Sequence, residues 1–154
     1  MTAQHLYIAQ HGLALSKEEA PERPLSPAGT AQTEAIARHL QAVGMPVSRI
    51  FHSGKLRAEQ TARIFADRLG IASVSAFNGL LPNDPVSDLI PQLDTDHGLY
   101  IGHLPQLQKL TDTLLTGDDN GHILQFINSA VICLERAGEL YRLRGYLTPE
   151  LVPL

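Results

Sequence analysis

The sequence predicts an α/β protein, a three-layer α/β/α sandwich with a mostly parallel central sheet and an antiparallel C-terminal edge. Between residues 6 and 114, short apolar runs alternate with amphipathic segments, the pattern of strands joined by right-handed helical crossovers. The last two apolar runs, 129–134 and 140–146, have no helical segment between them and predict an antiparallel pair. A length of 154 residues suits one domain over 1–154.

The first strand and helix are predicted from an apolar run and a capping sequence. Residues 6–9 form a short apolar run that stops at His11, so they predict a buried strand delivering a histidine at its carboxyl end. Ser26 and Pro27 are a typical N-cap and first helical residue, and Gly44 is a typical helix terminator. We expect a helix over 27–43. Its apolar stripe consists of Ile36, Leu40 and Val43.

The same pattern of strand, loop and helix then repeats. Residues 49–52 predict a second strand, followed by a helix that opens at Ser53 and ends before Gly70. Residues 74–77 predict a third strand. A short helix capped by Asp84 is expected to follow it and to end at Leu93.

Residues 98–102 predict a fourth strand, which ends at His103 as the first strand ends at His11. Pro105 starts the helix after it. The apolar positions of this helix are Leu107, Leu110 and Leu114.

Composition and charge exclude several classes of function. Hydrophobic residues make up 44% and charged residues 18%, as in globular proteins. The net charge of −4 comes without a basic block, so we expect no nucleic-acid and no membrane partner. No apolar run approaches the roughly 20 residues that span a bilayer, and we expect a cytoplasmic protein. The single cysteine, Cys133, lies in an apolar run and predicts a buried, inert thiol.

Three residues predict a site at the carboxyl edge of the sheet. His11 and His103 each follow a buried strand, and ligands of parallel α/β sheets bind where such strands end. Arg57, in the first turn of the second helix, can reach the same edge and bind phosphate oxygens with its guanidinium fork. The seven histidines lack the short spacings of common metal motifs, so we expect no metal and no cofactor.

Four ordered segments resemble the histidine phosphatase superfamily, whose fold is phosphoglycerate mutase-like. They are Tyr7–Gly12, Arg23–Ser26, Ser53–Thr61 and Gly102–Pro105. The short chain, the Arg-Pro-Leu segment and residues 81–85 are similar to the SixA-type phosphohistidine phosphatases. The resemblance implies that His11 accepts the phosphoryl group, that His103 is the second pocket histidine, and that Arg57 and Arg23 bind phosphate. Further substrate-binding residues on this basis are Gln10, Gly12, Ser53 and Lys55.

One position departs from the family pattern: Gln10 stands where the first motif has an arginine. A neutral hydrogen bond contributes about 1 kcal/mol where a charged one contributes about 1.5–3 kcal/mol, so we expect reduced activity. The loss could reach about a hundredfold if the interaction strengthens in the transition state. Lys55, two residues before Arg57, is a candidate to restore the positive charge.

The resemblance implies a phosphatase that acts on phosphohistidine of a signalling or phosphotransfer protein. The chain lacks the insertion that carries a general acid in larger members, which favours a good leaving group such as imidazole. Asp84 and Asp88 are interpreted as capping or surface carboxylates. Two alternatives stay open: a phosphatase of small phosphomonoesters, and a weakly active or non-catalytic phosphate-binding protein, suggested by Gln10.

Overall fold

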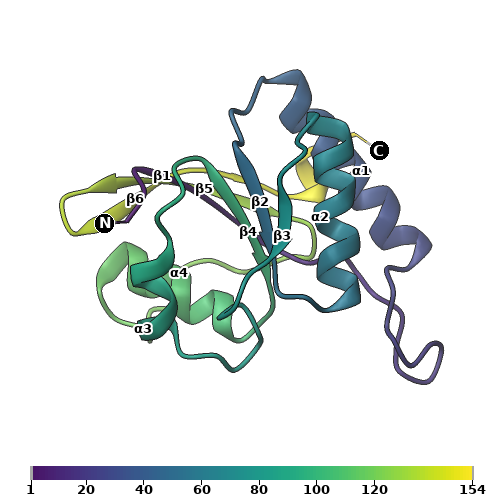
Figure 1. Cartoon of the computed structure of the whole chain (residues 1–154), viewed down its shortest axis with the longest axis horizontal. Coiled ribbons are helices and arrows are strands. Elements are labelled where there is room, and N and C mark those ends of the chain that lie inside the picture. Colours follow the sequence, from purple (N-terminus) through teal and green to yellow (C-terminus); the bar gives the residue numbers. More distant parts are fainter. Residues whose placement is uncertain (1, 154) are drawn as a thin grey trace.

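A computed structural model describes residues 2–153 as a six-stranded sheet with the order β3-β2-β4-β1-β5-β6 (Figure 1). The strands are β1 (His5–Gln10), β2 (Arg49–His52), β3 (Val74–Ala76), β4 (Gly98–Gly102), β5 (Val131–Ala137) and β6 (Leu140–Leu147). The helices are α1 (Pro27–Ala42), α2 (Leu56–Leu69), α3 (Val86–Leu89) and α4 (Gln106–Thr116), with 3-10 turns at Ile90–Gln92 and Pro149–Leu151. The predicted fold class and the order of its elements are confirmed.

The sheet is parallel from β3 to β1 and antiparallel beyond it. β4 lies between β2 and β1 and pairs with both in parallel. β5 runs antiparallel to β1, and β6 antiparallel to β5, as the missing helix between them predicts. Because β1 and β4 are parallel neighbours, Gln10 pairs with Gly102 and the residues that follow them emerge side by side.

Helices cover both faces of the sheet (Figure 1). One apolar cluster joins α1 and α2 to the face that carries Tyr7 and Ala9 of β1. The other joins α3 and α4 to the face that carries Leu6 and Ile8. Alternate side chains of β1 therefore point into opposite cores, which fixes the register of the strand. Among the described residues, no helix is both long enough and apolar enough to cross a membrane.

The ends of α1 follow the predicted capping chemistry with one exception. Ser26 Oγ accepts a hydrogen bond from the Gly29 N–H over 3.0 Å, and Gly44 takes the left-handed conformation after the helix. The prediction that Val43 belongs to the buried stripe is wrong. Val43 is the C-cap and is 57% exposed, because the chain leaves the helical path there and turns the side chain to solvent.

The other helix starts differ from prediction by a few residues. α2 begins at Leu56 rather than at Ser53, since Gly54 has a φ of 94° that no helix allows. α3 begins at Val86 with Pro85 as N-cap, and the Asp84 carboxylate accepts from the Leu81 N–H instead of capping the helix. Cys133 is only partly buried, and burial raises its pKa to about 11, as expected of an unreactive thiol.

Candidate active site

The two histidines predicted to meet do lie together at the carboxyl edge of the sheet. The His11 N–H donates to the Gly102 carbonyl over 3.1 Å, which extends the pairing of β1 and β4 by one residue. The imidazoles of His11 and His103 have centroids 4.9 Å apart, with planes inclined by 48°. The parallel pairing of the two strands thus sets the spacing of the two rings.

The His11 ring has a defined tautomer. Its Nδ1 lies 2.7 Å from the Gly12 carbonyl oxygen, which only accepts hydrogen bonds, so Nδ1 carries the proton and the Nε2 lone pair is free. The residue is 9% exposed. The pKa of His11 is lowered to about 4, chiefly by burial and to a smaller extent by the charges of Arg57 and Arg23, while the hydrogen bond to Gly12 acts in the opposite direction. The His11 imidazole is therefore neutral at pH 7.

His103 is also neutral and buried. Its Nε2 lies 2.6 Å from Ser53 Oγ, which comes from the loop between β2 and α2. Burial lowers the pKa of His103 to about 3, and His11 and Arg57 add to the effect, as do Lys55 and Arg23 more weakly. Arg57, Lys55 and Arg23 all lower the pKa of this ring, so positive charge collects around it.

Two arginines face the histidines. Arg57 is the second residue of α2, and its pKa is lowered by burial and by the charge of Arg23. Arg23 has a left-handed φ of 51°, and its Nε donates to the Leu15 carbonyl over 2.9 Å. Because the charge of Arg23 lowers the pKa of Arg57, an anion bound beside both guanidinium groups would offset their repulsion.

Unpartnered polar atoms gather at this edge. Among the described residues, six buried side-chain nitrogen or oxygen atoms have no hydrogen-bond partner. Three of them belong to Gln10, Arg57 and His103. Buried polar atoms are normally paired, so this concentration suggests a site that a polar ligand completes.

The remaining predicted residues lie around the same centre. Gly12 follows His11, and a side chain there would place Cβ 2.8 Å from Thr33 Oγ1, so only glycine fits. Lys55 is the N-cap of α2 and is exposed. Gln10 ends β1, with its amide oxygen buried and without a partner. The structure therefore places all eight predicted residues at one edge of the sheet.

Sequence reasoning missed the residues that hold the loop after β1. Thr61 Oγ1 accepts from the Gly12 N–H over 2.9 Å and donates to the Arg57 carbonyl over 2.7 Å. Asn128 Nδ2 donates to the His11 carbonyl over 2.9 Å. Thr61 ends the third segment that resembles the family, Ser53–Thr61, which was a usable signal, whereas nothing in the sequence around Asn128 indicates its position.

A hollow of about 340 Å³ borders the site at Ser53. Asp84 and Asp88 line it together with Asn78 and Phe77. The interpretation of these two aspartates as capping or surface groups therefore left out their position in the hollow that Ser53 also lines.

The comparisons with known proteins agree with the fold described above. Residues 6–80 match the sequence profile of the histidine phosphatase superfamily (branch 1). An uncharacterised protein of Picosynechococcus sp. is 29% identical over 138 residues, which cover 84% of this chain and 83% of the relative. Over residues 6–80 the chain is therefore similar to the histidine phosphatase superfamily.

Solved structures share the fold over nearly the whole chain. The protein histidine phosphatase SixA, complexed with tungstate, is 24% identical with a TM-score of 0.79, covering 94% of this chain and 97% of SixA. A protein assigned as SixA of Agrobacterium tumefaciens is 21% identical, with a TM-score of 0.79 and coverage of 97% and 100%. The alpha-ribazole phosphatase of Shigella flexneri is 14% identical, with a TM-score of 0.75 and coverage of 94% and 96%.

Proposed function

We propose that this protein is a phosphohistidine phosphatase that acts on a signalling or phosphotransfer protein, with His11 as the phosphoryl acceptor. The observation that carries the proposal is the pair of neutral imidazoles with centroids 4.9 Å apart, set beside two guanidinium groups. The solved SixA structure that shares this fold is complexed with tungstate, an oxyanion of phosphate-like shape. We also propose that the reaction takes place in the cytoplasm.

In the first step, the Nε2 lone pair of His11 attacks phosphorus in line with the departing nitrogen of the substrate imidazole. The new P–Nε2 bond forms as the old P–N bond breaks, and the substrate imidazole leaves with a proton from solvent or from its own remote nitrogen. Arg57, Arg23 and His103 donate hydrogen bonds to the equatorial oxygens. Water then attacks phosphorus, releases phosphate and restores His11. No metal ion takes part in these steps.

The hollow beside Ser53 favours an imidazole leaving group. Its volume of about 340 Å³ leaves room for a side chain that enters from a partner protein. The carboxylates of Asp84 and Asp88 line this space and can accept an N–H from the departing imidazole. An alkoxide leaving group would instead need a proton from an acid held at the site.

Two other functions make different predictions for the same residues. The alpha-ribazole phosphatase that shares the fold is named for a small-molecule substrate. A small phosphomonoester is therefore the second candidate substrate. A phosphate-binding protein without catalysis is the third candidate, suggested by Gln10 at the motif arginine position.

A substrate panel tests the proposal. Purified protein is assayed with a phosphohistidine peptide, p-nitrophenyl phosphate and a set of sugar phosphates, with His11→Ala as the matched control. The proposal predicts the highest kcat/KM on the phosphohistidine peptide and no turnover by the variant. Faster turnover of sugar phosphates would favour the small-molecule function. Phosphate binding without turnover of any substrate would favour the binding protein.

A further inference from the structure

We propose that His5, Asp96 and His97 form a binding site for a divalent transition-metal ion, with Zn²⁺ as the ion that suits its ligands best. The site lies at the opposite end of the strands from the catalytic histidines. His5 begins β1 and His11 follows its end, a separation of roughly 20 Å at about 3.3 Å per residue. Imidazole and carboxylate are the ligand types of zinc sites with three protein ligands and one water.

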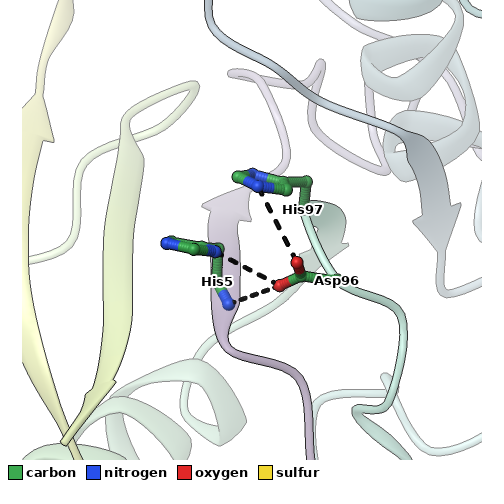
Figure 2. A group of neighbouring side chains, drawn as sticks. All are labelled: His5, Asp96 and His97. Atoms are coloured by element: carbon green, nitrogen blue, oxygen red, sulfur yellow. Dashed lines mark hydrogen bonds and ion pairs between the residues drawn. The ribbon is translucent and has the colours of Figure 1, made fainter.

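The side chains already converge (Figure 2). His5 Nδ1 lies 3.3 Å from Asp96 Oδ1, and His97 Nε2 lies 3.8 Å from Asp96 Oδ2. One ligand atom from each residue lies within 4.8 Å of the other two. Ligands about 2.0–2.1 Å from a tetrahedral ion are about 3.3–3.4 Å apart, so small side-chain movements complete the set.

Two of the three ligands are held in place by the fold. The His5 N–H donates to Asp96 Oδ1 over 2.7 Å, which ties the loop before β4 to the start of β1. His97 Nδ1 lies 2.9 Å from the Tyr7 hydroxyl, which leaves Nε2 for the ion. A partner on the second ring nitrogen is a regular feature of metal-binding histidines, because it fixes the tautomer and the ring orientation.

His5 is the ligand that must move. Its ring stacks on that of His97, with centroids 4.4 Å apart and planes 9° from parallel, whereas an ion lies in the plane of each ring it binds. The His5 side chain is 37% exposed, so its ring can rotate toward the ion in exchange for the 3.3 Å contact of Nδ1 with Asp96 Oδ1. A hollow of about 320 Å³, lined by His5 and Tyr7, gives the ring and a water ligand room.

Of the carboxylates near the site, we expect only that of Asp96 to bind the ion. Glu135 lies opposite His5 on β5, but Arg144 forms an ion pair with it. An ion bound by two imidazoles and one carboxylate would join the starts of β1 and β4. Sequence spacing could not reveal this cluster, because the pairing of two distant strands assembles it.

Zinc titration of the whole protein tests the proposal. Binding of Zn²⁺ is measured by calorimetry and by the shift in Tm, for the wild type and for Asp96→Asn, His97→Asn and Tyr7→Phe. Asparagine at 97 tolerates the left-handed φ of 60° found there, and asparagine at 96 keeps an acceptor for the His5 N–H. Controls are His39→Gln, an exposed histidine of α1, and His103→Gln, which removes a competing imidazole at the active site.

The proposal predicts one Zn²⁺ per chain and a rise in Tm with zinc concentration. Affinity falls about a hundredfold or more in Asp96→Asn and His97→Asn, falls about tenfold to a hundredfold in Tyr7→Phe, and is unchanged in both controls. Equal affinity in the wild type and in folded Asp96→Asn and His97→Asn would overturn it, as would loss of binding in His103→Gln alone. Phosphatase activity is not the readout, so the result is independent of the proposed reaction.

Discussion

The backbone N–H of Gly12 donates a 2.9 Å hydrogen bond to Oγ1 of Thr61, and through it the loop after β1 is tied to α2. The same hydroxyl donates to the Arg57 carbonyl over 2.7 Å. One buried side chain therefore connects Gly12, which fixes the His11 tautomer, to the helix turn that carries Arg57, the proposed phosphate-binding arginine.

Thr61→Val tests this positioning role. The variant keeps the shape of the side chain but leaves the buried Gly12 N–H without an acceptor, which costs about 1–3 kcal/mol of stability. We expect kcat on a phosphohistidine peptide to fall about tenfold, with a smaller change in KM, because ring placement rather than charge is lost. Thr61→Ser, which keeps the hydroxyl, should restore most of kcat. Equal kcat values for the valine and serine variants would show that the hydroxyl has no positioning role.

Gly29 is where the loop after β1 packs against α1. A Cβ at this position would lie 2.0 Å from the backbone carbonyl oxygen of Leu13, so the loop or the helix must shift. We expect Gly29→Ala to lower the free energy of unfolding by about 2 kcal/mol or more, measured by urea denaturation. Thr30→Ala, at the exposed neighbouring position, is the matched control and should change it little. A stable Gly29→Ala variant would mean that the loop has room to adapt.

Much of the site could be predicted because it depends on strand ends. Apolar runs that stop at His11 and His103 are sufficient to bring both residues to one edge once the strands pair in parallel. What the sequence could not predict depends on long-range contacts. Asn128 reaches His11 from beyond α4, and the pairing of β1 with β4 brings Asp96 to His5. The prediction that Val43 is buried was wrong for a local reason, because the periodicity of apolar residues does not show where a helix ends.

The replacement of the motif arginine by Gln10 is tested with a double-mutant cycle. We expect Gln10→Arg to raise kcat/KM by about tenfold to a hundredfold, since it restores a charge near the phosphoryl group. If Lys55 compensates for the missing charge, Lys55→Ala lowers activity in the wild type and much less in Gln10→Arg. Additive effects of the two substitutions would show that Lys55 does not compensate.

Acid should destabilise the protein through its active-site histidines. The pKa of His11 falls from 6.5 in the unfolded chain to about 4 in the folded one, so between these values the unfolded chain binds the proton first. The contribution of His11 to the stability of the folded state is therefore complete above pH 6.5 and is lost as the pH falls toward 4. When the pH falls from about 7 to about 4.5, the free energy of unfolding of His11→Asn should therefore decrease by about 2–3 kcal/mol less than that of the wild type.

Urea denaturation at the two pH values measures this difference. His39→Asn, at an exposed position, is the control and should behave like the wild type. The same loss of stability in wild type and His11→Asn would show that the folded protein does not keep His11 neutral in acid.

Trapping the phosphoenzyme tests the central claim most directly. The protein is mixed with a labelled phosphohistidine peptide, quenched in alkali, where phosphohistidine persists, and mapped by mass spectrometry. The proposed mechanism predicts label on His11 in the wild type and none in His11→Ala. Turnover without label on His11, or label that persists in His11→Ala, would contradict it.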